Sequence, residues 1–372
     1  GQYSPFSFAN EQNQIVGFDA SISEALAERM GVKVKIITTP FDGIIAGLLA
    51  KKYDAIVASM TITPERQKAV DFVGPYYRAG RTIVVKENSS ITSLDQLKAN
   101  IGDTTPRVLV INSNISASSL TKVNMGANKT LIGSFQNRTL ENIHLRATAQ
   151  SQNIILQNII FKHSASIKAN DDIQVYLNYG SKYWIDHCSF VGHSWSTTDG
   201  SEDKLLYIGE KADYATISNC LFGSHKYGLI FGHPADDNKA EFNGYPRLTL
   251  CHNRFDNMEV RAPGLMRYGY FHVYNNYINN FHLGFTLAQN ANILSESNYF
   301  GEGSQNKGML DDKGTGTFTD TNSVPPITNQ KSPKAQWTAS SNYAYTLKTA
   351  AQAKDFTQKN AGAQAAALVF GS

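Results

Sequence analysis

The sequence predicts a mainly β protein, a right-handed parallel β-helix preceded by a small α/β lobe. Between Ile155 and Phe300 one pattern recurs: an apolar residue, two spacers, Asn or Cys, one spacer, then an apolar or aromatic residue. The anchors of this pattern are Asn158, Cys188, Cys220, Asn253, Asn276 and Asn298. Their spacing varies from 22 to 33 residues, which suits coils with fixed strands and variable loops that bury apolar faces by stacking.

Composition is the second observation. Charged residues make up 17% of the 372 residues, as in turn-dense β structure rather than a helical bundle. A net charge of +3 does not indicate a nucleic-acid partner. Apolar runs stay below the ~18 residues of a membrane span. No signal peptide is visible at the first residues, so we expect any export signal to have been removed or lost.

The first 88 residues alternate helical and strand patterns. Helices are expected at 20–30 and 42–52, strands at 32–38, 55–59 and 81–86, and a helix start at Thr63-Pro64-Glu65. A βαβ pattern of this kind requires a parallel sheet with helices that cover both of its faces. We therefore place a truncated α/β lobe at 1–88.

Four short motifs carry a resemblance for this lobe: Tyr3-Ser-Pro-Phe6, Gly17-Phe-Asp19, Tyr53-Asp-Ala-Ile56 and Ser59-Met-Thr-Ile-Thr-Pro-Glu-Arg66. It resembles the first lobe of periplasmic polar-amino-acid-binding proteins. The resemblance implies that Ser59, Thr61 and Arg66 match the positions that hold the α-carboxylate, with Asp19 near the cleft. Because no second lobe follows, we expect these four residues to be vestigial and Arg66 to be a surface charge.

The junction is expected near residues 88–93, which leaves 89–372 for the β-helix. Ser93-Leu-Asp-Gln-Leu-Lys98 suits a helix at about 93–99 that caps the open first coil, and it would equally suit the helix after a binding-protein hinge. In the coils that follow, an Asn at one register can bond through its amide to the coils above and below. Cys188 and Cys220 share that register as buried small groups, because three cysteines cannot form a disulfide framework. The tail from Trp337 to Ala367 is expected to pack back along the coils.

Several separated motifs carry a second resemblance, from about residue 93 onward: Asn128-Lys-Thr-Leu-Ile-Gly133, Trp184-Ile-Asp-His-Cys188, Ala212-Asp-Tyr-Ala-Thr-Ile-Ser218, Arg261-Ala-Pro263 with Arg267, and His272-Val-Tyr-Asn-Asn276. This part resembles the pectin and pectate lyases of the parallel β-helix type, most of all the bacterial pectin lyases. The resemblance implies β-elimination of homogalacturonan by a secreted bacterial protein, extracellular or periplasmic, which we expect to be a monomer.

Elimination requires a base near C5 of the sugar and positive charge where the enolate-like oxygens develop. The resemblance implies that Arg261 is the base, although the very high pKa of arginine makes it a poor base unless neighbouring cations disfavour its charged form. Arg267 and Lys226 are candidates to supply that field and to bind substrate carboxyl oxygens. Arg267 follows Arg261 by six residues where the family spacing is five, which predicts a local bulge.

Calcium use is decided by a few acidic positions. Pectate lyases of this type bind Ca²⁺ through several carboxylates, and the resemblance aligns Asp203 and Tyr207 with one pair of them, beside Lys204. The loss of one carboxylate favours a pectin lyase that needs no cofactor, acts on the neutral methyl ester and uses Asp203 and its neighbours for substrate. The alternative is a calcium-dependent pectate lyase in which Asp203 binds the metal. Further candidates for contact with the sugar chain are Asp171 or Asp172, Trp195 and Tyr227.

An interpretation of another class remains open. The lobe could capture an amino acid while the β-helix serves as an inactive or carbohydrate-binding stalk. A replaced first coil would also leave strand edges that favour aggregation and could inactivate the enzyme.

Overall fold

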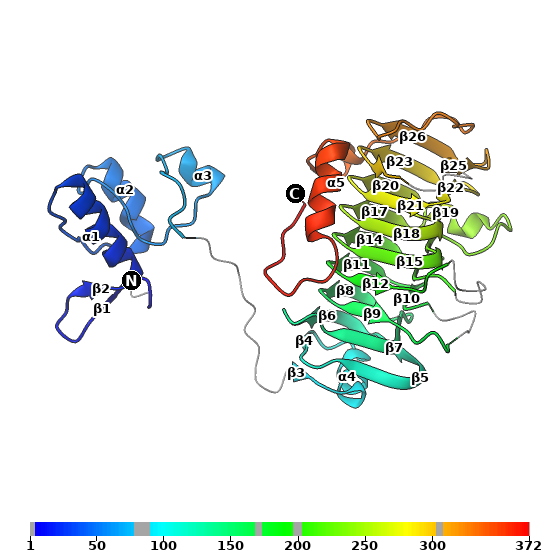
Figure 1. Cartoon of the computed structure of the whole chain (residues 1–372), viewed down its shortest axis with the longest axis horizontal. Coiled ribbons are helices and arrows are strands. Elements are labelled where there is room, and N and C mark those ends of the chain that lie inside the picture. Colours follow the sequence, from blue (N-terminus) through cyan, green and yellow to red (C-terminus); the bar gives the residue numbers. More distant parts are fainter. Residues whose placement is uncertain (1–3, 78–89, 168–172, 196–202, 303–307, 372) are drawn as a thin grey trace. The chain divides into compact units, whose positions relative to one another are not determined.

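The computed structural model describes residues 4–77, 90–167, 173–195, 203–302 and 308–371. The chain divides into two compact units, Gly1–Ile83 and Val84–Ser372 (Figure 1). Each unit is described by itself. Among the described residues, no helix is long and apolar enough to cross a membrane.

The first unit is mostly helix and irregular chain. It contains the antiparallel pair β1 (Phe8–Ala9) and β2 (Ile15–Val16), then α1 (Phe18–Met30), the 3₁₀ turn η1 (Phe41–Gly43), α2 (Ile44–Leu49) and α3 (Pro64–Gln67). Helix α1 ends at Gly31 in the left-handed conformation, and the Thr63 hydroxyl caps α3 by accepting a hydrogen bond from the Arg66 amide. Both helix ends agree with the sequence signals.

The prediction of a parallel sheet in this unit is wrong for the described residues. The segments 32–38 and 55–59 form no strand, and the expected strand 81–86 lies outside the described residues. Val32, Val34 and Ile36 are exposed. A strand requires a neighbour for its backbone N–H and C=O groups, and residues 4–77 supply no such neighbour, so these β-branched segments remain extended without pairing.

The second unit is a stack of parallel coils with two long sheets. The first sheet contains β3 (Ser90–Ile91), β4 (Arg107–Ile111), β6 (Ala127–Gly133), β8 (Gln152–Gln157), β11 (Ser181–Asp186), β14 (Asp213–Ser218), β17 (Arg247–Cys251), β20 (Tyr270–Tyr274), β23 (Asn292–Glu296) and β26 (Thr317–Thr321), adjacent in this order. Every pair of neighbours in it is parallel. The expected parallel β-helix is confirmed.

The second sheet has two arms that meet at β7 (Thr139–Arg146). Its first arm contains β5 (Ile115–Asn124), β9 (Ile160–Lys162), β12 (Ser189–Val191), β15 (Leu221–Tyr227), β18 (Arg254–Val260), β21 (Tyr277–Phe281) and β24 (Tyr299–Phe300). Its second arm contains β10 (Val175–Leu177), β13 (Leu206–Ile208), β16 (Leu229–Phe231), β19 (Leu265–Met266), β22 (Leu283–Leu287) and β25 (Gly308–Asp312). A coil thus runs from the first sheet through both arms, as in β14, β15 and β16. The turns between the arms form the arm corner.

The interior of the coils is apolar, and its best-ordered part is a column of rings. Phe161, Phe190, Phe222 and Phe255 occupy one register of the first arm. Successive ring centroids lie 5.0, 4.8 and 5.1 Å apart, and the rings are nearly parallel. At the open end, α4 (Leu94–Ile101) buries Leu97 and Ile101 in the same core. This is the cap helix that was expected at about 93–99.

The asparagine ladder is present from Cys220 onward. The side-chain oxygen of Asn253 accepts from the Cys220 amide at 2.8 Å, that of Asn276 accepts from the Asn253 amide at 2.9 Å, and that of Asn298 accepts from the Asn276 amide at 3.0 Å. Each side-chain N–H₂ group also donates to a neighbouring backbone carbonyl. The ladder therefore satisfies buried polar groups through the middle of the stack.

The anchor Asn158 is wrong by one residue. Gln157 pairs with Asp186 across the first sheet, so Ile159 occupies the ladder register that Cys188 holds in the next coil. Asn158 itself is the turn residue before it, with φ of 58°, and matches His187 rather than Cys188. A slip of one residue moves a side chain from one face to the other, and Asn158 accordingly points out of the coil.

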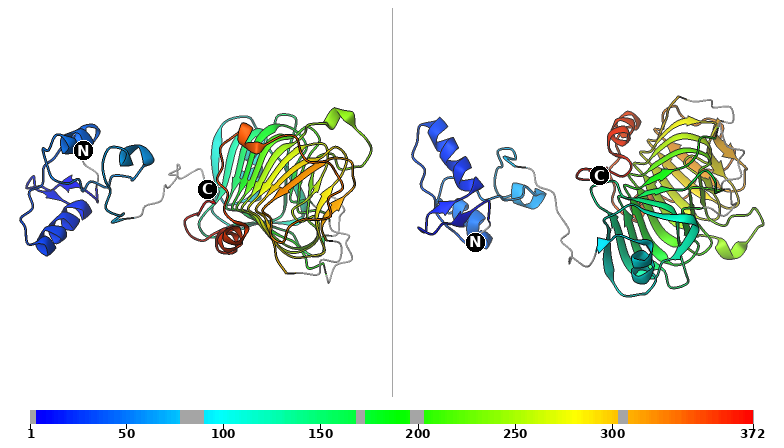
Figure 2. Two further views of the ribbon diagram at one scale, coloured as in Figure 1. Left: turned by 90° about the horizontal axis from the view of Figure 1, so that it is seen from above. Right: turned by 60° about the horizontal axis from the view of Figure 1, so that its bottom comes forward.

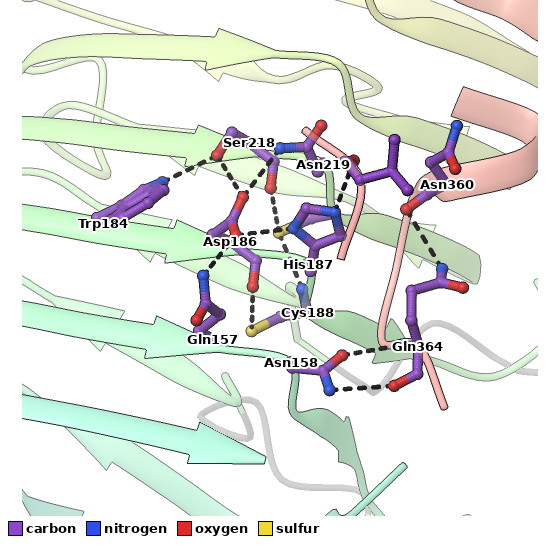
Figure 3. Close-up of polar contacts among 12 residues, drawn as sticks. Gln157, Asn158, Trp184, Asp186, His187, Cys188, Ser218, Asn219, Asn360 and Gln364 are labelled. Carbon is purple, nitrogen blue, oxygen red and sulfur yellow. Dashed lines mark hydrogen bonds and ion pairs between the residues drawn. The ribbon is translucent and has the colours of Figure 1, made fainter. Parts of the chain in front are cut away.

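The C-terminal segment packs along the outside of the coils, as expected (Figure 2). It contains η4 (Ala339–Ser341) and α5 (Ala350–Asn360), which begins with a capping box of Thr349 and Gln352. Gln364 exchanges two hydrogen bonds with Asn158 (Figure 3). The Val369 carbonyl accepts from the His187 ring at 3.1 Å. The turn residues of successive coils thus bind the returning chain.

Candidate active site

The arm corner brings several predicted residues together. Asp203 and Lys204 precede β13, Lys226 and Tyr227 end β15, and Arg261 follows β18. The backbones of these three coils are hydrogen-bonded in register at this point: the Leu205 amide donates to the Gly228 carbonyl, and the Gly228 amide to the Val260 carbonyl, both at 3.0 Å. Stacking of the coils therefore collects residues that are far apart in sequence.

Arg261 is held in a left-handed backbone conformation with φ of 65°, and its carbonyl accepts from the Leu229 amide at 3.2 Å. Its side chain is half-buried, and the guanidinium carbon lies 5.0 Å from the centroid of the Tyr227 ring. Burial lowers the pKa of Arg261 and the charge of Arg267 lowers it further, while Tyr227, Asp203 and Asp236 act in the opposite direction. The net direction is the one that a guanidine base requires.

Lys226 adds a second cation at the corner. Its ammonium lies 5.7 Å from the centroid of the same Tyr227 ring, and both side chains are half-buried. An aromatic face attracts cations, so both basic groups lie close to the ring of Tyr227. A partly buried pair of cations of this kind can stabilise an enolate-like oxygen.

Arg267 is placed differently from the expectation. Its side chain is 6% exposed, and its Nε donates to the Asp236 carboxylate at 2.6 Å. Its Nη1 donates to the backbone carbonyls of His233 and Pro234 at 3.3 and 3.1 Å. The guanidinium thus fastens the loop that follows β16. The expectation that Arg267 contacts the substrate directly is therefore not supported, because its Nε and Nη1 atoms are engaged within the protein and its side chain is covered. The charge of Arg267 still acts on Arg261.

Asp203 and Lys204 form an ion pair beside this corner. Asp203 is buried, its carboxylate contacts the Lys204 ammonium and it also accepts from the Lys204 amide at 2.9 Å. Among the described residues, no group of three or more His, Cys, Asp or Glu side chains could hold a metal ion. The described donors therefore do not fit a calcium site of several carboxylates, and we derive no step through such an ion.

The remaining candidates divide into three cases. Tyr207 is 1% exposed and stacks on Tyr176 at a centroid distance of 4.6 Å, in a small apolar cluster that is separate from the coil interior, so its ring offers almost no surface to a sugar. Trp195 is half-buried and packs against His282 of the arm corner at 4.4 Å. Asp171 and Asp172 lie outside the described residues.

A row of histidines lies beneath the corner, and two of them, His163 and His193, were not singled out from the sequence. His163 and His193 lie 4.5 Å apart between ring centroids, and the Nδ1 atom of His225 accepts from the His193 amide at 3.3 Å. The Nε2 atom of His225 lies 2.5 Å from the Asp203 carbonyl oxygen, so this ring supports the Asp203 backbone. Burial and the nearby His193 and His225 lower the pKa of His163 to about 3. The signal was present, because His193 and His225 hold the same place after Cys188 and Cys220.

The four residues of the first unit do not assemble into a carboxylate-binding group. Asp19 is buried and accepts from the hydroxyls of Ser59 and Tyr76, each at 2.9 Å. Arg66 instead donates to the Thr61 carbonyl at 2.8 Å and lies over the Phe41 ring. The carboxylate of Asp19 thus has its own donors, and Arg66 is turned toward its own segment.

The chain is a parallel β-helix with arginine and lysine side chains gathered at one corner of its coils, the arrangement expected for a β-helical polysaccharide lyase. The chain belongs to the pectate lyase family, whose model matches residues 37–366. A pectin lyase of Pseudomonas marginalis is 95% identical over 283 residues, which cover 76% of this chain and 91% of that protein. Pectin lyases of Pectobacterium carotovorum and Bacillus subtilis are 60% and 53% identical, each over 76% of this chain and over 91% and 81% of their own lengths.

Solved structures agree in fold. A pectate lyase from Bacillus sp. N165, determined in complex with trigalacturonate, has a TM-score of 0.62 and 22% identity, and the match covers 73% of this chain and 92% of that chain. A Bacillus subtilis pectate lyase has a TM-score of 0.66 at 20% identity over 76% of this chain and 94% of that chain. At these identities the likeness concerns the fold alone.

Proposed function

We propose that the protein is a pectin lyase that cleaves methyl-esterified homogalacturonan by β-elimination. Arg261 removes the proton on C5, the electron pair of that bond forms the C4–C5 double bond, and the C4–O bond breaks, with the leaving oxygen taking a proton from water. Lys226 stabilises the charge that develops on the carboxyl-ester oxygens. The observation that carries the proposal is the half-buried guanidinium of Arg261, whose pKa burial and Arg267 lower.

The preference for the ester has its own support. A methyl-esterified uronate is neutral, so its C5 proton is more acidic and no metal is needed to neutralise a carboxylate. Lys204 already occupies the carboxylate of Asp203, and relatives at 53% identity and above are named pectin lyases. Tyr227 and Trp195 are proposed to contact the sugar chain, because both are half-buried aromatic side chains in the region of the arm corner.

The test is one assay in four conditions. Methylated pectin and demethylated polygalacturonate are each incubated with and without a chelator, and the ultraviolet absorbance of the unsaturated uronide is followed. We expect cleavage of methylated pectin at a rate that the chelator leaves unchanged. Loss of activity in chelator that Ca²⁺ restores would instead identify the calcium-dependent pectate lyase, with Asp203 among the metal ligands.

The site of action and the rival class are tested separately. A polysaccharide is too large to enter a bacterial cell, so we propose a secreted monomer that acts in the periplasm or outside the cell, to be checked by cell fractionation and size-exclusion chromatography. An amino-acid-binding function would appear as heat in a calorimetric titration with polar amino acids. We expect none, because the Asp19 carboxylate is engaged by Ser59 and Tyr76.

A further inference from the structure

We infer that Asp236 determines specificity for the ester: its carboxylate occupies, on Arg267, the place that a free uronate of the substrate would take. This inference rests on the proposed function and names a residue that sets its substrate class. Asp236 lies in the loop after β16, in the coil before that of Arg267. Asp236 is not one of the site residues that were predicted from the sequence.

The geometry of the pair places the carboxylate outside and the guanidinium inside. The Asp236 side chain is 66% exposed, whereas that of Arg267 is 6% exposed. The Arg267 Nε donates to Asp236 Oδ1 at 2.6 Å, and its Nη1 is directed to two backbone carbonyls of the same loop. The surface that a polysaccharide meets at this point is therefore a carboxylate.

The Asp236 backbone is fixed as well as its side chain. Its carbonyl accepts from the Gln289 side chain at 3.2 Å, and the Lys239 amide in the same loop donates to the Tyr268 hydroxyl oxygen at 3.0 Å. The loop is thus tied to the coil of Arg267 through Arg267 and Tyr268, and to the next coil through Gln289. A carboxylate held this firmly cannot move aside without cost when an anionic substrate approaches.

Asp236 also belongs to the electrostatic field of the arm corner. The hydrogen bond from Arg267 is the main cause of a lowered pKa for Asp236, and the charges of Lys313 and Arg261 act in the same direction. The carboxylate is therefore ionised at neutral pH. In return the charge of Asp236 acts on Arg261.

The chemical consequence differs between the two substrates. A galacturonate unit carries a carboxylate of its own, which would seek an arginine fork and would be repelled by a fixed like charge in its place. A methyl ester carries no charge and meets no such repulsion. Discrimination against the wrong substrate by a repulsive element is a common source of specificity.

The matched variants are Asp236→Asn and Asp237→Asn. Asp237 is the adjacent carboxylate, 49% exposed, and it lies near His233 and Lys239 instead of Arg267. The measurement is the ratio of kcat/KM on polygalacturonate to that on methylated pectin. We expect Asp236→Asn to raise this ratio about tenfold, mainly through a lower KM for polygalacturonate, and Asp237→Asn to change it less than about twofold. Asp236→Glu, which keeps the charge, should retain the wild-type ratio.

A purely structural role for Asp236 predicts another result. Loosening of the loop would change both substrates alike, so an unchanged ratio in Asp236→Asn, or an equal rise in Asp237→Asn, would overturn the inference. Binding of trigalacturonate and of its methyl ester is also measured by calorimetry. If the wild type fails to cleave pectin, the proposed function fails, yet the inference still stands or falls on whether Asp236→Asn tightens binding of the acid alone.

Discussion

Arg261 combines a backbone conformation that most residues avoid with a guanidinium placed on an aromatic ring. The left-handed conformation costs a residue with a side chain about 1–2 kcal/mol, and such positions persist where the surrounding structure fixes them. Here the Leu229 amide and the Tyr227 ring provide that constraint. The backbone conformation and the Tyr227 ring therefore fix the side chain of Arg261 at one place in the arm corner.

The first prediction concerns this side chain. Arg261→Ala should lower kcat on methylated pectin by about 100–10,000-fold, the usual contribution of a general base, while the circular dichroism spectrum stays unchanged. The control is Arg247→Ala, which removes an arginine that pairs with Asp213 on the first sheet. We expect the control to keep kcat within about twofold. A near-normal rate in Arg261→Ala would remove this residue from its role.

The resemblance to the lyase family was enough to collect Arg261, Lys226, Tyr227 and Asp203 as candidates, and the structure places all four at or beside the arm corner. The burial of Arg267 could not be predicted, because its partner Asp236 comes from a loop of another coil. The burial of Tyr207 depends likewise on Tyr176 of the coil before it. Partners in neighbouring coils are set by the stacking, which a motif within one coil does not encode.

At the scale of elements, the Asn ladder joins one coil to the next. Asn276 accepts from two donors of Asn253 and donates to the Leu250 carbonyl, all in the buried interior. Truncation would leave several buried groups without partners, and each such group costs about 1–3 kcal/mol. The ladder thus stabilises the stack in these coils through hydrogen bonds that an apolar side chain cannot make.

The second prediction compares two asparagines of one coil. Asn276→Ala should lower the free energy of unfolding by about 3 kcal/mol. Asn280→Ala should lower it by only about 1 kcal/mol, because the Asn280 amide bonds to Asn257 on the exposed surface and the main loss is the preference of Asn for its φ of 51°. Urea denaturation followed by tryptophan fluorescence measures both, since Trp184, Trp195 and Trp337 all belong to the second unit. Equal losses in the two variants would contradict the structural role of the ladder.

The element pattern was predictable where neighbours repeat it and unreliable where they do not. From Cys188 onward the predicted anchor residues occupy the ladder register. Near Asn158 the two adjacent polar residues Gln157 and Asn158 led to a prediction that was wrong by one position. In the first unit, β-branched segments such as 32–38 had the composition of strands without a neighbour to pair with. Strand formation is decided by pairing partners rather than by composition alone.

At the scale of the whole molecule, the C-terminal segment ties the second unit together across many coils. Its central contact involves Asp186 and His187, which are fully buried (Figure 3). Asp186 accepts from His187 Nδ1 at 2.7 Å, from Ser218 at 2.8 Å and from the side-chain amides of Gln157 and Asn219 at 2.9 Å. His187 in turn faces the Val369 carbonyl of the tail.

The third prediction follows from the pKa of Asp186. Burial acts to raise this pKa, but hydrogen bonds led by that from His187 outweigh it, so the pKa lies below its ordinary range. A depressed pKa contributes stability above the unfolded-state pKa, which is lost as the pH falls through the folded-state value. We therefore expect the free energy of unfolding to fall below about pH 4, with the loss weakened in Asp186→Asn.

Asp186→Asn should also cost about 1–3 kcal/mol at pH 7, because it replaces one acceptor oxygen by an N–H₂ group that faces the buried donors around Asp186. The control is Asp355→Asn, an exposed carboxylate on α5, which should change the free energy of unfolding by less than about 0.5 kcal/mol. Urea titrations between pH 7 and pH 2.5 provide both comparisons. Identical pH profiles for wild type and Asp186→Asn would remove Asp186 from this role.

The returning tail has a mechanical consequence. Its contacts with Asn158, His187 and Asn275 are arranged one after another along the stack, whereas the coils are joined by whole ladders of backbone bonds. A force that pulls on the C-terminus would load the tail contacts singly and the ladders collectively. Under tension the C-terminal segment would detach in small steps at low force. The stacked coils would unfold only at a much larger force.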